Sequence, residues 1–277
     1  MDFKGGWVYF NNDFIPDQQL KVREVEFSNS IYEVVRIIER IPLFLEEHLI
    51  RLSDSMKILG LAPSFTSKDI RNIMLKLSEL CEISNGNIKI ELMLLDSHKY
   101  LACIYFIPHL YPSDNSYKIG IKTITHRIVR PNPHIKQSIV NDRIRNEIKH
   151  IQTISNSSEV ILLNKKNEIT EGSKSNVFFI GQNTIYSPLS KQILKGITRE
   201  KIIEIAKVSG FRFSQCIIPY SSLYRFEAGF LTSTSFKVLP INQIDKHELD
   251  PKHKTIITIQ NLYNQLIENY CLKNQKV

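Results

Sequence analysis

The spacing of apolar residues near the N-terminus predicts strands. Residues 7–10 and 14–15 are mostly apolar and flank Asn-Asn-Asp at 11–13, residue types that tolerate left-handed turns, so we expect a hairpin there. The segment 25–40 is rich in Val, Ile and Tyr and predicts two further strands. The chain therefore opens with sheet structure.

The period then changes to that of a helix. Apolar residues recur every three or four positions from residue 45 to 59, and Gly60 stands where such a helix would end. Ser67 is expected to cap a second helix, and the apolar runs 88–95 and 100–107 predict another hairpin. Strands and helices together indicate a small α+β domain.

The second half of the chain predicts a larger α/β domain with a barrel-like sheet. The expected elements are a strand at 117–124, a helix at 138–151, strands at 160–163, 176–180 and 184–187, and helices at 198–208 and 256–267. Prolines between residues 112 and 133 mark a linker, so we expect a boundary near residue 120, with domains 1–120 and 121–277.

Length and composition are those of an ordinary globular protein. The chain has 277 residues, of which 42% are hydrophobic, and its net charge of +8 is spread along the sequence. The four cysteines are scattered without metal-ligand spacing, which predicts free thiols and no metal site. The sequence has neither a signal-peptide pattern nor an apolar run long enough to cross a membrane, so a soluble, cytoplasmic protein is expected.

Common catalytic motifs are missing: the phosphate loop, the dinucleotide fingerprint, the zinc-protease helix and the serine-hydrolase elbow. Four other stretches could carry chemistry. Glu171, in the small polar run 170–176, could hold a cationic group, and the glycine and threonine at 196–198 could bind an anion before a helix. Hydroxyls at 232–235 could bind phosphate, and Lys136 could be a reactive amine.

Each stretch also has a purely structural interpretation. The run 170–176 could be a solvated turn, 196–198 a helix cap, 232–235 part of an exposed strand, and Lys136 a solvated lysine. Taken together, however, an anion site, a carboxylate and a reactive amine are the parts of a pyridoxal phosphate site.

The sequence resembles the class IV, or fold-type IV, pyridoxal-phosphate aminotransferases, the group of branched-chain and D-amino-acid aminotransferases and 4-amino-4-deoxychorismate lyases. The resemblance runs nearly end to end and is carried by the blocks 32–36, 47–52, 135–136, 170–176, 194–199 and 232–234. The T-E-G-S-x-S-N and L-x-G-I-T-R blocks are the most specific.

The resemblance implies a role for each matching residue. Lys136 would form the Schiff base with pyridoxal 5'-phosphate and later move the substrate proton, and Glu171 would pair with the pyridine nitrogen. Tyr32 would line the substrate pocket. The phosphate would be bound by Arg51, by the backbone of Ile197 and Thr198, and by the hydroxyls of Ser233 and Thr234. The cofactor would lie in a cleft between the two domains of each subunit of a homodimer.

Some positions depart from the family pattern. Asn141 stands where many branched-chain enzymes have a tyrosine, and Lys89 stands near the place of a substrate-side arginine. Recognition of the substrate carboxylate is therefore left open among Arg36, Arg127 and Arg130.

The resemblance predicts amino transfer between an amino acid, of branched-chain or D-type, and a 2-oxo acid. The alternative within the family is a lyase that releases pyruvate and 4-aminobenzoate from 4-amino-4-deoxychorismate. A relative that binds the cofactor without turnover is a third possibility. The net charge motivates a nucleic-acid-binding protein, but the sequence has no basic face interleaved with aromatics, so no nucleic-acid or membrane partner is expected.

Overall fold

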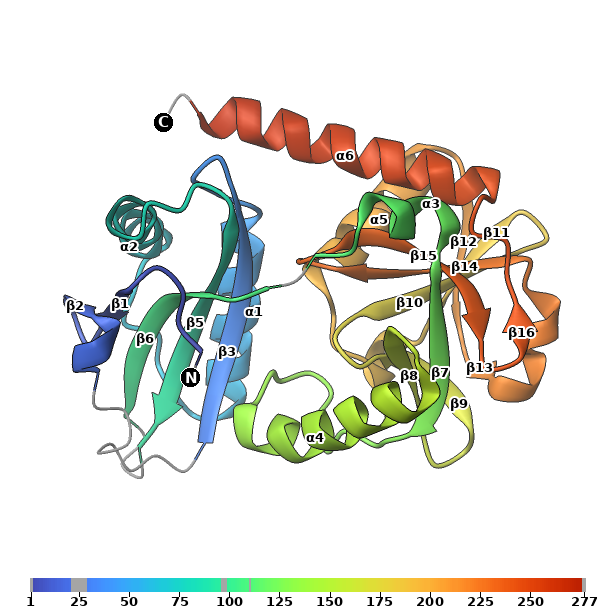
Figure 1. The fold of residues 1–277 in the computed structure, drawn as a ribbon, viewed down its shortest axis with the longest axis horizontal. Helices are drawn as coiled ribbons and strands as arrows, with labels where there is room; N and C mark the ends of the chain where they lie inside the picture. Colours follow the sequence, from blue (N-terminus) through green and yellow to red (C-terminus); the bar gives the residue numbers. More distant parts are fainter. Residues whose placement is uncertain (1, 21–28, 96–98, 110, 276–277) are drawn as a thin grey trace. The chain divides into compact units, whose positions relative to one another are not determined.

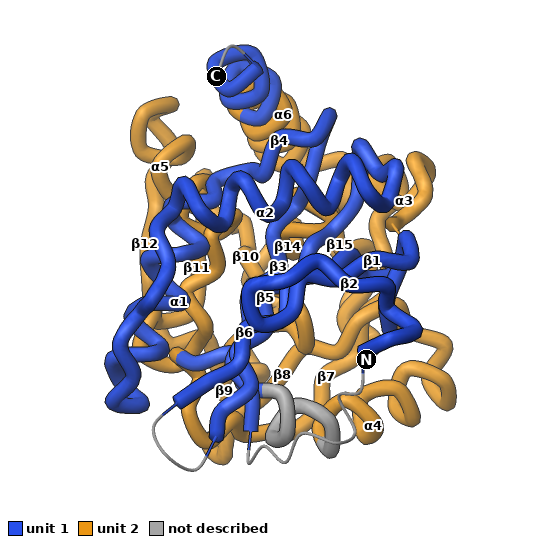
Figure 2. Tube along the Cα trace, turned by 90° about the vertical axis from the view of Figure 1, so that its left-hand side faces the viewer, with its two compact units in different colours: residues 1–110, 135–141, 267–277 blue, residues 111–134, 142–266 orange. Residues whose placement is uncertain are grey.

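The chain forms two compact units, coloured separately in Figure 2. The computed structural model describes residues 2–20, 29–95, 99–109 and 111–275, and only the backbone of 138–143. Unit 1 comprises residues 1–110, 135–141 and 267–277, and unit 2 comprises 111–134 and 142–266. The boundary near residue 120 remains a prediction about which parts of the chain fold independently.

Unit 1 contains a six-stranded antiparallel sheet with two helices on one face (Figure 1). Its strands, in the order β2-β1-β6-β5-β3-β4, are β1 (Trp7–Phe10), β2 (Asp13–Pro16), β3 (Asn29–Ile38), β4 (Ile41–Pro42), β5 (Gly86–Leu94) and β6 (Tyr100–Ile107). The helices are α1 (Leu45–Ile58) and α2 (Ser67–Leu80), and a short 3-10 helix follows β2 at Asp17–Gln19.

Strand β3 separates two kinds of side chain. Ile31, Val35 and Ile37 are buried in the core that the sheet forms with α1 and α2. Because successive side chains of a strand point to opposite faces, Glu33 lies on this core face and Tyr32 on the other. The alternation therefore places an acid among apolar residues.

Unit 2 is built on a ten-stranded mixed sheet. Its strands are β7 (Ile121–Arg127), β8 (Glu159–Leu163), β9 (Glu168–Gly172), β10 (Asn176–Gly181), β11 (Thr184–Pro188), β12 (Arg212–Cys216), β13 (Ile218–Pro219), β14 (Ala228–Ser233), β15 (Lys237–Ile244) and β16 (His247–Glu248). The helices in this part of the chain are α3 (Asp114–Ile119), α4 (Ser138–Ser155), α5 (Ile197–Val208) and α6 (Lys254–Asn274), with 3-10 helices at Ser190–Gln192 and Tyr220–Arg225.

One core draws on most strands of this sheet. Its buried members include Leu163 of β8, Ile169 of β9, Val177 of β10, Leu231 of β14 and Leu239 of β15. Because strands from both halves of the sheet order bury side chains in one cluster, the sheet wraps around it.

Most predicted elements are confirmed, and a few are wrong. Residues 117–119, expected in a strand, end helix α3, whose first turn is capped by the Ser113 hydroxyl, which accepts the N–H of Ser116 at 3.3 Å. The strand begins only after Gly120, which has φ +73° and no room for a Cβ beside the backbone of Asn242.

Two further differences concern caps and strands. Thr66, not Ser67, caps α2, and it forms a capping box with Asp69. Residues 29–38 form one continuous strand where two were expected within 25–40, and 25–28 lie outside the described residues. Strand β9, which carries Glu171, was not predicted, because Ile169 is the one large apolar residue among its five.

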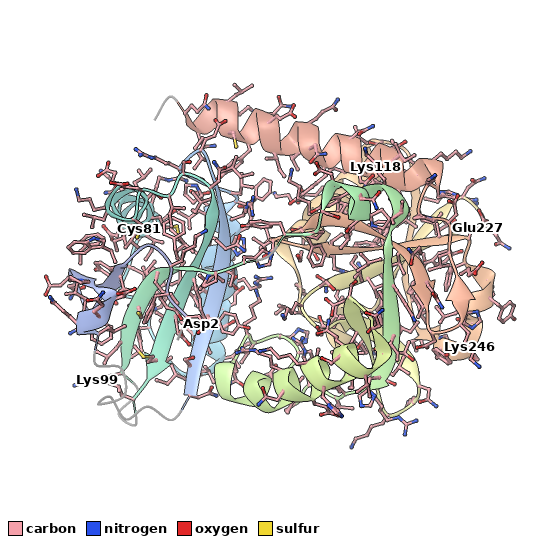
Figure 3. All side chains as sticks on the ribbon, in the orientation of Figure 1. Asp2, Cys81, Lys99, Lys118, Glu227 and Lys246 are labelled. Carbon is pink, nitrogen blue, oxygen red and sulfur yellow. The ribbon has the colours of Figure 1, made fainter. Side chains whose placement is uncertain are left out.

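The four cysteines form no disulfide bonds in the described structure. Cys81 follows the last turn of α2, where Figure 3 labels it, and Cys81 and Cys103 are buried. Among the described residues, no helix has the length and apolar character needed to span a bilayer.

Candidate functional site

Lys136 is fixed by its backbone to the edge of β3. The Tyr32 N–H donates to the Lys136 carbonyl at 3.1 Å, and Ile31 and Gln137 form an isolated β-bridge. Ile135 is buried in the core of unit 1. The half-buried Lys136 side chain places its Nζ 5.6 Å from the centroid of the Tyr32 ring. The structure thus brings together two of the residues singled out from the sequence.

Arg51, expected to bind phosphate, is held by a buried acid. Its Nε and Nη2 donate to the two carboxylate oxygens of Glu33, at 2.7 and 2.6 Å. His48, one helical turn earlier on α1, lies 2.8 Å through its Nδ1 from Oε2 of Glu33. The side chains of Glu33 and His48 are 2% and 1% exposed, whereas that of Arg51 is 12% exposed.

The charges in this cluster decide its protonation. Burial alone would raise the pKa of Glu33, but the positive charges of Arg51 and Lys136 and hydrogen bonds from His48 and Arg51 outweigh it and lower that pKa well below its usual range. Burial lowers the pKa of His48, and the same two cations add to this effect against the opposing attraction of Glu33. At neutral pH the acid is therefore ionised and His48 is neutral, with the proton on Nδ1 donated to Glu33.

A second ion pair lies on the opposite face of the unit 1 sheet. Lys89 Nζ is 2.8 Å from Oε2 of Glu91 and 4.6 Å from the centroid of the Tyr32 ring. Glu91 also accepts hydrogen bonds from Ser30 and Tyr105, both at 2.6 Å. The lysine that departs from the family pattern is thus paired with an acid, and it shares the Tyr32 ring with Lys136.

Glu171, on β9 in unit 2, is 3% exposed and surrounded by donors. Its Oε2 accepts the Leu194 N–H at 3.0 Å and the Asn176 side-chain amide at 3.5 Å. Arg130 Nε lies 3.4 Å from Oε1, and Arg130 Nη2 donates to the carbonyl of Ser173 at 2.6 Å. These contacts hold the Glu171 carboxyl group in one orientation.

A second buried acid holds the turn that follows Glu171. Glu159 accepts the hydroxyl of Ser173, the N–H of Ser173 at 3.2 Å and the hydroxyl of Ser175 at 3.3 Å. The Gly172 N–H donates to the Ser175 carbonyl at 2.8 Å, and a Cβ at Gly172 would overlap the Ser175 hydroxyl. The small residues of the 170–176 block therefore allow a tight turn, and its serines stabilise that turn by hydrogen bonds to Glu159.

Helix α5 begins at Ile197 with Gly196 as its N-cap, and no side chain caps it. Thr198, expected before the helix, is its second residue, and the N-cap of the stretch is Gly196. A Cβ at Gly196 would overlap Oδ1 of Asn176. The first N–H groups of a helix lack intrahelical partners and carry a partial positive charge, which makes this end suited to an anion.

The hydroxyls of β14 complete the arrangement in unit 2. Thr232 is 1% exposed, and its Oγ1 has no hydrogen-bond partner among the described residues. The Ser233 hydroxyl accepts the Phe236 N–H at 3.2 Å, and Thr234 is half-buried in the turn before β15. A buried hydroxyl without a partner is costly, and a phosphate oxygen would satisfy it. The residues of this unit therefore fit a phosphorylated ligand.

The remaining site predictions are placed as follows. Arg127 donates to Asn167 at 2.5 Å, and Arg130 is engaged by Glu171, whereas Arg36 lies on β3 opposite Asn87. The side chain of Asn141 lies outside the described residues. The cleft between domains, like the ligand roles themselves, remains a prediction.

Sequence reasoning assigned no role to Glu33, His48 or Glu159. Glu33 and His48 lie in the matching blocks 32–36 and 47–52, and an acid and a histidine at otherwise core-facing positions were the available signals. Glu159 gave no such signal, because its partners lie 14 and 16 residues away.

Comparison with known proteins identifies the family. Residues 30–244 match the family described as Amino-transferase class IV. The chain is 27% identical over 255 residues to a D-alanine aminotransferase of Bacillus licheniformis, covering 86% of this chain and 88% of the relative. It is 23% identical over 280 residues to an aminodeoxychorismate lyase of Bacillus subtilis, covering 95% of each.

A solved structure has the same fold. A T.th. branched-chain amino acid aminotransferase, complexed with N-(5'-phosphopyridoxyl)-L-glutamate, superposes with a TM-score of 0.80 at 21% identity, over 95% of this chain and 94% of that one. The predicted fold class, fold-type IV with mixed α and β structure, is confirmed, and the structure has two sheets. The chain belongs to the class IV aminotransferase family, a family of enzymes.

Proposed function

We propose that the protein is a pyridoxal 5'-phosphate enzyme that transfers an amino group between an amino acid and a 2-oxo acid. The observation that carries the proposal is Lys136, fixed by backbone pairing to β3 with its amine beside the Tyr32 ring. The family match and the phosphopyridoxyl ligand of the T.th. aminotransferase structure support the cofactor. When bound, this cofactor supplies an aldehyde for the lysine amine and a ring that accepts electrons.

The chain's own residues would bind the cofactor and move the proton. Arg51, the N–H groups of Ile197 and Thr198, and the hydroxyls of Ser233 and Thr234 would bind the phosphate. Glu171 would accept a hydrogen bond from the pyridine nitrogen and favour its protonated form.

Lys136 Nζ would take the proton from Cα of the amino acid and deliver it to C4′ of the cofactor, as amino transfer requires. Tyr32, whose ring lies beside that amine, would line the substrate side. We further propose, from the resemblance, a homodimer.

The visible spectrum of the purified protein tests the cofactor assignment. After incubation with pyridoxal 5'-phosphate and dialysis, wild type is expected to be yellow and Lys136→Ala colourless, because only Lys136 holds the cofactor covalently. Lys89→Ala is the matched control: it removes a lysine beside the same Tyr32 ring and is expected to stay yellow. A colourless wild type, or a yellow Lys136→Ala variant, would contradict the proposal.

The lyase remains a second candidate, favoured by the match over 95% of the B. subtilis aminodeoxychorismate lyase. Product analysis separates the two reactions. A transferase forms glutamate from 2-oxoglutarate with leucine or D-alanine, whereas a lyase forms pyruvate and 4-aminobenzoate from 4-amino-4-deoxychorismate. Pyruvate and 4-aminobenzoate without amino transfer would overturn the transferase proposal.

A further inference from the structure

The Glu33–His48–Arg51 cluster contains an acid whose charge opposes the function proposed for Arg51. A phosphate is attracted to the guanidinium and repelled by the carboxylate that contacts it. Glu33 is also almost completely buried, and burying a charge is costly unless it is paired. The presence of this buried acid beside Arg51 therefore needs an explanation other than its charge.

The geometry of the cluster supplies that reason. Arg51 donates from Nε and from Nη2, one to each oxygen of Glu33, so the carboxylate fixes the plane of the guanidinium as well as its position. A free arginine side chain loses about 2 kcal/mol of rotamer entropy when it is ordered. In this cluster the ordering is already complete in the folded chain.

His48 in turn holds the acid. Its Nδ1–H is donated to Oε2 of Glu33, the oxygen that also accepts from Arg51 Nη2. Because His48 is buried and its pKa is lowered, it orients the carboxylate without adding a competing positive charge. Both His48 and Arg51 lie on α1, whereas Glu33 lies on β3, so the cluster also fixes the helix relative to the sheet at this point.

We propose that Glu33 and His48 are positioning residues that hold Arg51 in the orientation in which it binds the cofactor phosphate. The inference rests on the proposed function, because it takes Arg51 as a phosphate ligand. A role of Glu33 through its charge alone and a role in positioning Arg51 predict opposite changes in phosphate affinity when Glu33 is removed. If Glu33 acts only through its charge, its removal strengthens phosphate binding; if it positions Arg51, its removal weakens it.

The test compares pyridoxamine 5'-phosphate with pyridoxamine. Neither has the aldehyde, so both bind without a covalent bond to Lys136. The dissociation constant of pyridoxamine divided by that of pyridoxamine 5'-phosphate therefore measures the contribution of the phosphate alone. In Glu33→Gln this ratio is expected to fall by about tenfold or more, the loss of one well-oriented charged contact.

Glu46→Gln is the matched control. Glu46 also lies on α1 and pairs with an arginine, Arg71, at 2.6 Å, but it has no contact with Arg51, Glu33 or His48 among the contacts described. The ratio is expected to equal that of wild type in this variant. Equal weakening of both ligands in Glu33→Gln, or a ratio that is unchanged or larger, overturns the proposal.

A conservative variant covers the case in which Glu33→Gln does not fold. Glu33→Asp keeps the charge and withdraws the carboxylate by one methylene group, so a charge effect predicts no change and positioning predicts a smaller ratio. A ratio equal to that of wild type in Glu33→Asp overturns the proposal. Failure of the proposed function is recognised separately, because wild type would then bind both ligands equally.

Discussion

Adjacent residues of β3 have different environments. Tyr32 lies beside the Lys136 amine, and Glu33 binds His48 and Arg51 behind the sheet. Glu33 is an isolated acid among apolar neighbours in sequence, and its ionisation depends on the charges of Arg51, on α1, and of Lys136. The chemistry of this site thus depends on buried polar residues that are hydrogen-bonded or ion-paired.

The first prediction concerns pH and His48. The folded state lowers the pKa of His48 below its ordinary value of 6.5, through burial and the charges of Arg51 and Lys136. The unfolded chain therefore binds a proton that the folded chain does not, so this residue's contribution to stability is lost as the pH falls below about 6.5. Glu33, whose pKa is also lowered, stays ionised in this range and loses its contribution only below its ordinary value of 4.5.

Urea unfolding of wild type and His48→Asn at pH 7.5 and 5.5 measures this effect. Asparagine keeps a donor for Glu33 but does not titrate, so the loss of unfolding free energy on acidification is expected to be smaller in the variant, by about 1.4 kcal/mol for each pKa unit of depression that lies within the range. Equal losses in the two proteins would show that His48 is not held neutral.

The sequence predicted the residues whose local pattern is informative. Lys136 was identified between a proline-rich turn and a helix, and Glu171 in a run of small polar residues. The supports of these residues could not be predicted, because hydrogen bonds join positions distant in sequence. Glu33 accepts a hydrogen bond from Arg51, which lies 18 residues away in sequence, and Glu171 accepts one from the N–H of Leu194, which lies 23 residues away.

At the level of elements, the start of a helix is coupled to the start of a strand. Gly196, the N-cap of α5, leaves space for Asn176 at the start of β10, and the Asn176 amide donates to the Leu194 carbonyl at 2.8 Å and to Glu171. The uncapped N–H groups and the buried acid are thus tied together through one amide. The apolar periodicity predicted both elements, but not this connection, since it arises from side-chain packing.

Gly196→Ala tests this coupling. The backbone φ of Gly196 is −67°, which alanine adopts freely, so only the overlap of its methyl group with Asn176 matters. The thermal unfolding free energy is expected to fall by about 1–3 kcal/mol, as for other overpacked sites. The dissociation constant of pyridoxamine 5'-phosphate is expected to rise, because the first turn of α5 is displaced. Unchanged values of both would contradict the coupling.

At the scale of the whole molecule, residues in both units are proposed to bind one ligand. Arg51 and Lys136 belong to unit 1, whereas Glu171, Ile197 and Thr198 belong to unit 2. A ligand that binds only the folded chain stabilises each unit that must be folded for the ligand to bind.

The two sheets and their helices were largely predictable from apolar periodicity, but the assignment of 135–141 and 267–277 to unit 1 was not, because it depends on long-range packing.

Calorimetry with added cofactor checks this expectation. At about 100 times its dissociation constant, pyridoxal 5'-phosphate is expected to stabilise the protein by about 2.7 kcal/mol. If the chain melts in two steps, both transitions are expected to shift upward. In Lys136→Ala the shift with pyridoxal 5'-phosphate is expected to shrink, while that with pyridoxamine 5'-phosphate is retained. A shift confined to one transition would contradict the involvement of both units.

The alternation along β3 also limits how this protein tolerates insertion and deletion. One residue added or removed within Asn29–Ile38 ahead of Tyr32 would exchange the faces of Tyr32 and Glu33, turning the acid away from α1 and the ring in against it. A library of single-codon insertions is expected to yield active clones at the exposed hairpin turn of 11–12 and none in this strand. The register that keeps Tyr32 and Glu33 on opposite faces of the sheet is therefore required together with the two side chains.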